Sequence, residues 1–380
     1  MPNKTVDLGH TFQEAGLNWD GWDPIGKHFT ESQIERGIAL IENSAHLRSH
    51  RHEFQMWEAI TTTDFPYLFG TIIDRELMAR YRVALADYSA YTKFGTVSNF
   101  AQHTRDRLDG LDNILPRVTQ KGEYLVAPVS SEHYTRQVFK RGCQFDISWE
   151  ALVDDGMGAF DDVPARFSDA AINTDAWLVT SALAGAAGPN AAMYATGTCT
   201  NAGVLPASIA NVSATLALMA AQTNAAGLPM GIRGMHIVVP PAMEDDMRAI
   251  LTSTLKQWTE VGAGGGIPVP TDNVLKQRGL ILHVDPWLPY IDVSADVNTT
   301  WYVFADPAQG YAVGLDHLRG HEGPEIVMKA SNKVSVGGGV SSPFDGDFES
   351  DNVFYRVRTC PGTCNIDPRM TYVQTGTGQG

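Results

Sequence analysis

Three histidines near the amino end have a spacing that could perform chemistry. His46 and His50 lie four positions apart, so on a helix they would share one face, and His52 follows closely. Imidazole nitrogens bind zinc, but a zinc site needs three or four protein ligands, and the neighbouring sequence supplies too few. Arg48 and Arg51 stand among these histidines. We therefore interpret the segment as a positively charged patch and predict no metal site.

Pairs of adjacent carboxylates are a second candidate for chemistry, because two carboxylates with different pKa values can act as acid and base. Such pairs occur at Asp154 and Asp155, at Asp161 and Asp162, and at Asp245 and Asp246. Each pair begins a predicted helix or lies in its first turns, where negative charge interacts favourably with the helix dipole. We therefore expect these carboxylates to stabilise helix ends and not to catalyse a reaction.

Two further patterns match catalytic motifs only in part. Residues 262–266 are glycine-rich, but they lack the lysine and the strand-before, helix-after context of a phosphate-binding loop. His321 and Glu322 lack a second histidine at helical spacing, and the sequence has no Gly-x-Ser-x-Gly motif. The sequence therefore predicts no catalytic residue and no cofactor-binding residue.

The four cysteines bear on redox and metal chemistry. Cys360 and Cys364 flank a three-residue turn, a spacing that could hold a disulfide or half of a metal site. Zinc sites of this kind normally have a second ligand pair, which the sequence does not offer. Cys143 and Cys199 stand alone. We expect reduced thiols, as in an intracellular protein, and no metal.

The composition excludes several classes of protein. The chain has 380 residues, of which 43% are hydrophobic, so it can bury a large core and is not a disordered chain. Its formal charge is -15, which argues against direct binding to the phosphates of DNA or RNA. The first residues show no secretion signal, and the most apolar stretch, 176–187, is too short to cross a bilayer. We expect a protein that is neither secreted nor embedded in a membrane.

The amino-terminal region is expected to lie against another surface. Residues 1–63 have few periodic runs, with one helix predicted over 31–47, and we interpret them as an extended arm. Such an arm cannot bury its own large apolar side chains, so they must lie on another surface. The arm residues that we expect to contact a neighbouring subunit are Trp19, Trp22, Phe29 and Trp57.

Residues 95–147 are predicted to form a long β-ribbon. A turn at Lys121 and Gly122 precedes a strand over 123–129, and a second, longer strand is predicted over 133–147. A two-stranded ribbon is marginally stable alone, so we expect it to project and to pair with a neighbouring subunit. The predicted contact residues are Tyr124, Tyr134, Arg136, Phe139, Lys140 and Arg141.

The rest of the chain alternates helices and strands, which predicts an α+β fold. Helices are predicted from Asp64 onward and over 161–184, 213–226 and 240–255. Strands are predicted over 235–239, 279–284, 301–305, 311–315 and 353–358.

The order of these features resembles the major capsid protein of tailed bacteriophages, nearest to the Mu-type major head subunits. The resemblance covers about residues 60–370 and depends on several short stretches taken together. They are FPYLFG at 65–70, GEY at 122–124 with the loop at 134–145, ISWEALVDDGMGAF at 147–160, IVVPPAME at 237–244, WYVFADP at 301–307 and VFYRVR at 353–358.

The resemblance implies the capsid fold that tailed phages share with herpesviruses. The implied parts are an N-terminal arm (1–63), a peripheral-domain helix (64–94), an extension loop formed by a β-hairpin (95–147), a peripheral domain with a long spine helix (148–210), an axial domain (211–352), and a segment that returns to the peripheral domain and ends in a tail (353–380).

The resemblance also implies a function. Subunits of this family assemble as hexamers and pentamers into an icosahedral head, which encloses double-stranded DNA without sequence-specific binding. It implies a scaffolding protein, a portal and a decoration protein as partners, and a location in the virion after assembly in the host cytoplasm. Arg48 and Arg51 would then lie near DNA on the inner surface.

Two other classes of function stay open. An encapsulin-like compartment has the same fold but stores a cargo enzyme, and a soluble enzyme could have a dispersed site that no motif reveals. The arm and the ribbon argue against an enzyme, which has no evident need of both. The phage-like stretches and the long N-terminal arm favour a virus head over a compartment.

Covalent cross-linking is a feature of some members of the family, in which a loop lysine joins an asparagine of a neighbour. Lys121 or Lys140 with Asn352 or Asn365 would be candidates, but no spacing selects a pair, and we expect no cross-link.

Overall fold

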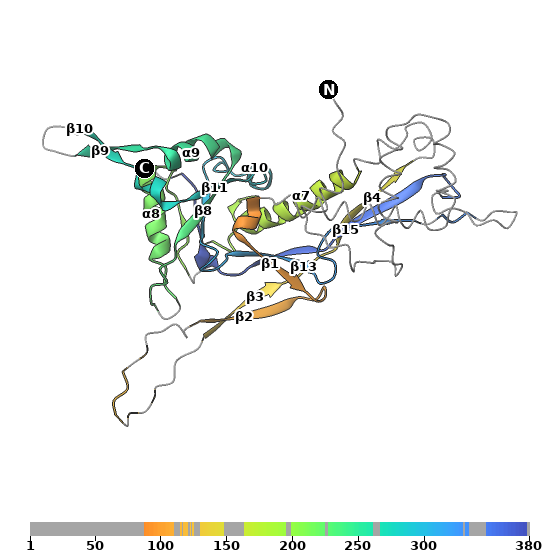
Figure 1. Ribbon diagram of the computed structural model, residues 1–380, viewed down its shortest axis with the longest axis horizontal. Coiled ribbons are helices and arrows are strands. Elements are labelled where there is room, and N and C mark those ends of the chain that lie inside the picture. Colours follow the sequence, from red (N-terminus) through yellow and green to blue (C-terminus); the bar gives the residue numbers. More distant parts are fainter. Residues whose placement is uncertain are drawn as a thin grey trace, which may run out of the picture. The chain divides into compact units, whose positions relative to one another are not determined.

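The computed structural model describes residues 87–109, 130–147, 163–194, 199–224, 227–260, 267–329, 331–333 and 347–377, with 115, 117–120, 122 and 124 (Figure 1). The chain divides into two compact units. The first contains Phe139–Thr174 and Arg319–Pro361, and the second contains Ala86–Val138, Asp175–Leu318 and Gly362–Gly380. Each unit is therefore assembled from segments that are distant in the sequence.

The second unit is built on a five-stranded sheet with the order β11–β8–β12–β17–β7. Its strands are β7 (Ala202–Gly203), β8 (Gly234–Val239), β11 (Ile281–Val284), β12 (Trp301–Ala305) and β17 (Thr371–Gln374). Strand β8 is parallel to β11, and β12 is antiparallel to both β8 and β17. Every residue of β12 is buried, as expected for an uninterrupted apolar run that is covered on both faces of a sheet.

Helix α8 (Ile209–Ala220) packs against this sheet. The hydroxyl of Ser208 accepts a hydrogen bond from the Asn211 amide and begins the helix. A Cβ atom at Gly234 of β8 would lie 2.5 Å from Leu216 Cδ2, so glycine is needed there for the helix to approach the strand. Several short elements complete this unit: η1 (Asp87–Ala90), β5 (Ala184–Gly185), β6 (Gly188–Pro189), η2 (Pro241–Met243), α9 (Glu244–Thr252), η3 (Val274–Arg278), α10 (Leu288–Ile291) and η4 (Pro368–Met370).

A second, three-stranded sheet has the order β1–β13–β16. It contains β1 (Thr92–Val97), which is parallel to β13 (Val313–Leu318), and β16 (Pro361–Asn365). Two antiparallel hairpins accompany it in this unit. One pairs β2 (His103–Asp109) with β3 (Ser130–Arg136), and the other pairs β9 (Leu255–Glu260) with β10 (Ile267–Asp272).

The first unit has a smaller sheet with the order β14–β15–β4. Its strands are β4 (Arg141–Ile147), β14 (Glu325–Met328) and β15 (Val353–Thr359), and both pairings are antiparallel. The Phe145 ring lies 5.1 Å from Tyr355 and 5.0 Å from Phe167, measured between ring centroids. These aromatic contacts hold the sheet against the long helix α7 (Val163–Leu183).

Several predicted elements are confirmed. The long helix over 161–184 is observed as α7, and the glycine-containing turn of β5 and β6 follows it directly. The predicted strands at 235–239, 279–284, 301–305, 311–315 and 353–358 correspond to β8, β11, β12, β13 and β15. A hydrogen bond from the Gly122 amide to the Thr119 carbonyl confirms the turn at that position.

The single strand predicted over 133–147 is wrong. The segment forms two strands with different partners, since β3 pairs with β2 and β4 pairs with β15. Between them Val138 is fully buried, and the Phe139 amide donates a hydrogen bond to the Pro361 carbonyl. These residues leave the ladder because the chain passes from one unit to the other at this point.

Two helix boundaries also differ from the prediction. The helix expected over 213–226 is α8, which begins at Ile209 because Ser208 caps it and ends at Ala220. The residues after it form a turn in which the Asn224 side chain accepts from the Leu228 amide. The helix expected over 240–255 ends at Thr252, because the Asn273 side chain donates to the carbonyls of Ile250 and Ser253.

Some predictions fall outside the described residues. They are the helices at 31–47 and from Asp64, the strand over 123–129 apart from Tyr124, and the glycine-rich loop at 262–266. In the part of the chain that the structure describes, no helix combines the length and the apolar character that a membrane span requires.

We predict that Leu216→Ala lowers the free energy of unfolding of the isolated subunit by about 2–5 kcal/mol, because it leaves a cavity between α8 and the sheet. The side chain of Leu216 is 3% exposed, whereas Leu218, on the same helix, is 46% exposed. Leu218→Ala is therefore the matched control and should change stability by about 0.5 kcal/mol or less. Urea unfolding measures both, and equal losses would contradict the packing described.

Candidate functional site

The base of the β2–β3 hairpin contains a buried ion pair of the second unit. The guanidinium of Arg136 donates two hydrogen bonds to the Asp316 carboxylate of β13, and the Nε–Oδ2 distance is 2.6 Å. The two side chains are 12% and 3% exposed. Asp316 raises the pKa of Arg136, so this pair stays charged. It joins the end of the hairpin to the three-stranded sheet.

Two neighbouring residues accommodate this ion pair: one leaves space for it, and the other contacts it. A Cβ atom at Gly95 of β1 would lie 2.4 Å from both partners, so only glycine leaves room for them. The thiol of Cys364 donates to Asp316 Oδ2 at 3.7 Å. Burial, and then the nearby carboxylate, raise the pKa of Cys364 to about 12. This cysteine is therefore a neutral thiol at physiological pH and supplies no thiolate nucleophile or metal ligand.

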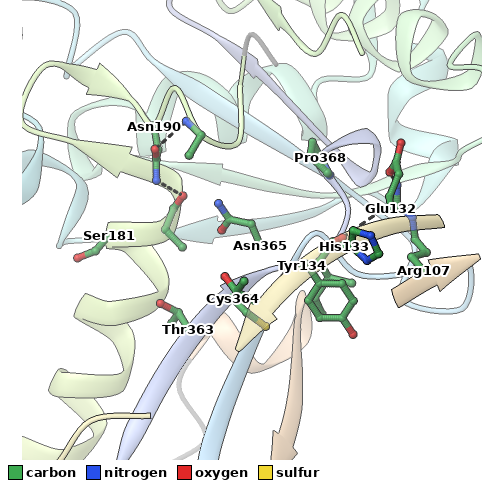
Figure 2. Close-up of a pocket in the computed structure, with 14 residues that line it drawn as sticks. Arg107, Glu132, His133, Tyr134, Ser181, Asn190, Thr363, Cys364, Asn365 and Pro368 are labelled. Carbon is green, nitrogen blue, oxygen red and sulfur yellow. Dashed lines mark hydrogen bonds and ion pairs between the residues drawn. The ribbon is translucent and has the colours of Figure 1, made fainter. Parts of the chain in front are cut away.

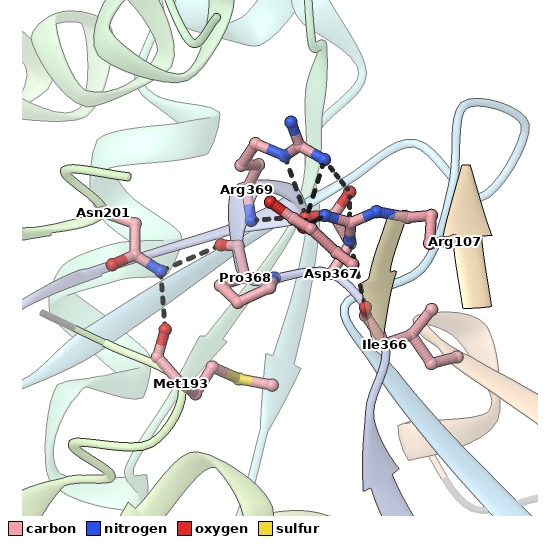
Figure 3. A network of polar contacts seen from close by, with 8 residues as sticks. Arg107, Met193, Asn201, Ile366, Asp367, Pro368 and Arg369 are labelled. Carbon is pink, nitrogen blue, oxygen red and sulfur yellow. Dashed lines mark hydrogen bonds and ion pairs between the residues drawn. The ribbon is translucent and has the colours of Figure 1, made fainter. Parts of the chain in front are cut away.

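A second polar cluster holds the other strand of the hairpin (Figure 3). Arg107 of β2 forms ion pairs with Glu132 and with Asp367, the latter at 2.9 Å, and donates to the Ile366 carbonyl at 3.1 Å. Arg369 is 4% exposed and donates to Asp367 at 3.1 Å. Two arginines thus face two carboxylates, so the cluster has no net charge.

The segment after β16 is fixed from its other side. The Asn201 amide donates to the Pro368 carbonyl at 2.9 Å and to the Met193 carbonyl at 3.0 Å (Figure 3). The Asp367 carboxylate also accepts from the Arg369 amide, which begins η4. Every buried charge here has a hydrogen-bonded partner, as a low-dielectric interior requires.

A polar pocket of about 670 Å³ opens beside these clusters (Figure 2). Its walls come from β2 and β3, from β16 with the residues after it, and from the end of α7 with the turn that follows. The residues that line it are Arg107, Glu132, His133, Tyr134, Thr135, Ser181, Ala182, Asn190, Ala192, Thr363, Cys364, Asn365, Ile366 and Pro368. Its arginine is paired with Glu132, and most of its other polar groups are neutral hydrogen-bonding groups, so the pocket can bind polar groups.

A buried histidine pair lies in the five-stranded sheet and has no signal in the sequence. His236 Nδ1 and His283 Nε2 are 2.9 Å apart and share a hydrogen bond. The Tyr91 ring lies edge-on to His283 and stacks on Phe304. Burial lowers the pKa of both histidines, and the positive charge of His283 further lowers that of His236. Each histidine therefore resists protonation in the folded state.

The first unit has its own ion-pair cluster. Glu325 accepts hydrogen bonds from His321 and from Arg358, at 2.6 and 2.8 Å for the two Arg358 nitrogens. Burial opposes ionisation, but these hydrogen bonds lower the pKa of Glu325. His321 therefore belongs to a structural cluster of β14 and β15. Nowhere in the described ranges do three or more His, Cys, Asp or Glu side chains gather as a metal site would need.

None of the described cysteines forms a disulfide. Cys360 and Cys364 are both buried, Cys199 is partly exposed and Cys143 is exposed. Burial raises the pKa of Cys360 as well, which makes it a poor nucleophile.

The predicted contact residues of the ribbon have different surroundings. Tyr124, Phe139 and Lys140 are exposed, Tyr134 lines the pocket, and Arg141 is half-buried. Arg136 forms the internal pair with Asp316, a role that the sequence did not indicate. Tyr134 and Arg136 belong to the second unit, and Phe139 begins the first. Their contacts with a neighbouring subunit stay a prediction.

The arm residues Trp19, Trp22, Phe29, Trp57, Arg48 and Arg51 lie outside the described residues. The carboxylates of Asp245 and Asp246 lie in the first turn of α9, as predicted.

Comparison with known proteins assigns the chain to a class. The profile of a family described as phage capsid protein matches residues 133–374. A comparison with curated proteins gives no match.

Solved structures with a similar fold have low sequence identity to this chain. A protein of Microbacterium phage Oxtober96 is 11% identical with a TM-score of 0.45, and the match covers 76% of this chain and 90% of that one. The capsid structure of cyanophage P-SCSP1u is 12% identical with a TM-score of 0.47, and the match covers 76% of this chain and 88% of that one. A holo encapsulin complex from Synechococcus elongatus is 10% identical with a TM-score of 0.43, and the match covers 78% of this chain and 86% of that one. The family profile, and not these scores, carries the assignment.

We predict that Arg136→Met lowers the free energy of unfolding by about 3–5 kcal/mol, because it leaves the buried Asp316 carboxylate without its partner. Arg136→Met combined with Asp316→Leu should be more stable than the single variant, since no unpaired charge remains. Arg105→Met, at an exposed position on β2, is the control and should change stability by about 0.5 kcal/mol or less. Urea unfolding of the wild type, the two single variants and the double variant gives the four free energies of unfolding in this cycle. If the losses of the two single variants simply add in the double variant, the buried pair is refuted.

We also predict that the histidine pair makes the subunit less stable in acid. Because the folded pKa values lie below the unfolded value of about 6.5, the unfolded chain binds more protons, and stability falls as the pH drops below about 7. The slope is at most about 1.4 kcal/mol per pH unit for each histidine. Replacing His236 and His283 by Gln should flatten it, whereas His133→Gln, at an exposed site, should keep it. Urea unfolding between pH 7 and 5 measures the slope, and an unchanged slope in the double variant would exclude this origin.

Proposed function

Because the chain belongs to the phage capsid protein family, we propose that it is the major capsid subunit, which assembles as hexamers and pentamers into an icosahedral head around double-stranded DNA. Membership of this family makes it a structural protein of the virion and not an enzyme.

The family match over residues 133–374 is the observation that carries this proposal. The matched region begins in β3 and ends with β17, so it includes strands of both compact units. The buried charged groups described above agree with a structural role, because each forms an internal ion pair or hydrogen bond. Such internal pairs hold each unit in a constant geometry, which a shell subunit needs in order to present its surfaces to neighbours.

We assign capsid domains to the two units on this basis. The unit with β4, β14 and β15 would be the peripheral domain, with α7 as the spine helix, and the five-stranded sheet would form the axial domain. The hairpin of β2 and β3 would be the base of the extension loop. In this assignment β17 belongs to the axial sheet, and only the segment of β15 returns to the peripheral domain.

The extension loop is proposed to bind neighbouring subunits. A two-stranded ribbon is marginally stable alone. The ion pair of Arg107 with Asp367 anchors β2, and the ion pair of Arg136 with Asp316 anchors β3. We propose that the loop projects from this fixed base in a constant direction. Tyr124, which is 83% exposed, would lie in the projecting part and provide apolar contact area to a neighbour.

The acidity of the chain fits a container for DNA. A net charge of -15 repels phosphates, so the head would confine the genome without gripping it. Arg48 and Arg51 of the arm are proposed as a local exception near the inner surface. The further partners that we propose are a scaffolding protein, a portal and a decoration protein.

We predict that the purified chain, expressed with its scaffolding protein, forms closed shells that electron microscopy can detect. Replacing residues 110–129 by a short Gly-Ser linker should leave a folded subunit, because Arg107 and Arg136 remain in place, but should abolish stable shells. Circular dichroism and thermal unfolding verify the fold, and microscopy counts the shells.

The control replaces residues 334–343, in the first unit, by the same Gly-Ser linker. Normal shells from the 110–129 variant would refute the role of the ribbon, and a wild-type chain that stays monomeric at high concentration would refute the proposed function. Shells that enclose a host enzyme in place of DNA would indicate a compartment of the encapsulin type.

A further inference from the structure

Three basic side chains gather at one edge of the five-stranded sheet. Arg233, Lys276 and Arg278 are all exposed. The Arg233 guanidinium donates to the Arg278 carbonyl at 3.2 Å, which holds the two segments together. Within the described ranges none of the three has an ion-pair partner. Asp306, whose backbone amide donates to the Arg233 carbonyl, uses a carboxylate oxygen to accept from the Ala308 amide.

The topology of the sheet explains why these residues meet. Strands β8 and β11 are parallel neighbours, so their amino ends lie at the same edge. Arg233 immediately precedes β8. Lys276 and Arg278 lie in η3, which ends at Gly279 in the left-handed conformation (φ +69°) directly before β11. Like charges are therefore brought together by the crossover, and no ion pair with another described residue compensates them.

The opposite edge of the same strands has the opposite charge. Helix α9 follows the carboxyl end of β8, and its first turn presents the exposed Asp245 and Asp246. Neither carboxylate forms an ion pair with a described residue, whereas their neighbour Glu244 is paired with Arg248. At about 3.3 Å per residue, the six residues of β8 separate the two charged edges by about 20 Å.

We infer that the cluster of Arg233, Lys276 and Arg278 binds the acidic edge of a second copy of this chain, at Asp245 and Asp246. The contact is head-to-tail, because the two complementary surfaces lie at opposite edges of one sheet. Head-to-tail contacts generate rings when the rotation closes. This inference rests on the proposed function and adds the surface by which copies meet within a ring.

Charge complementarity selects this partner. The chain has a net charge of -15, so two copies repel each other unless a basic surface of one meets an acidic surface of the other. A single exposed ion pair contributes little to binding. In a closed ring every copy makes the contact, and the repeated contacts act together. Such pairs chiefly determine which surfaces meet.

Charge reversal tests the contact. Lys276→Glu with Arg278→Glu should give a folded subunit whose yield of shells is at least tenfold lower. The matched control also replaces one lysine and one arginine by glutamate. Its substitutions, Lys93→Glu and Arg356→Glu, lie at exposed positions on β1 and β15, and it should assemble like wild type. Thermal unfolding verifies that both variants fold. If the reversed variant does not fold, Lys276→Gln with Arg278→Gln replaces it, and the same loss of shells is expected.

Rescue distinguishes a contact between copies from other roles. Adding Asp245→Lys and Asp246→Arg to the reversed variant should restore shells, because opposite charges then meet again. Failure of this rescue in a folded variant would overturn the inference. Normal empty shells from the reversed variant with reduced DNA content would also overturn it and would assign the cluster to nucleic acid. Absence of shells from the wild-type chain would instead count against the proposed function.

Discussion

The buried ion pair of Arg136 and Asp316 determines how the β2–β3 hairpin is joined to the rest of its unit. A charged side chain that is 3% exposed is stable only with a close partner of opposite charge, so Asp316 requires Arg136 at the end of β3. Gly95 leaves the space for the pair, and Cys364 contributes a hydrogen bond from its thiol. Once β3 is held in this way, its register with β2 places Arg107 against Asp367, and the second polar cluster follows.

The perturbed pKa values of this protein have a structural origin. Burial raises the pKa of Cys364, and it lowers the pKa of His236 and His283. In an enzyme such groups would gather around one cleft with a nucleophile and a base. Here they are spread over separate sheets, and each is satisfied by a neighbour from its own unit. This arrangement agrees with a structural protein, because the buried charged groups fix the geometry of each unit.

The elements that sequence patterns predicted well are those with a strong local signal. The run of buried residues in β12, WYVFA, has no polar interruption, and α7 ends at a glycine-containing turn. The break between β3 and β4 could not be predicted, because residues 143–147 alternate between apolar and polar, and the mixed residues before them, 134–141, contain no glycine or proline that would mark a turn. It arises from the burial of Val138 and from a backbone hydrogen bond between Phe139 and Pro361, which are more than two hundred positions apart in the chain. The predicted start of helix α8 lies too far along the chain for a related reason, since the observed start depends on a single hydroxyl, that of Ser208.

The sequence by itself determined the acidity, the types of most elements, the expectation that no catalytic group is present, and the family, through short stretches such as IVVPPAME and VFYRVR. Periodicity, capping and composition are local properties, and residues a few positions apart are sufficient to express them. Only the tertiary structure decided that Arg136 points to Asp316, 180 positions away, and not to a neighbour. It also decided that Arg233 and Arg278 share one edge, because the parallel pairing of β8 and β11 is a contact between distant segments. Partners of this kind are selected by burial and by charge in three dimensions, and no local pattern in the chain encodes them.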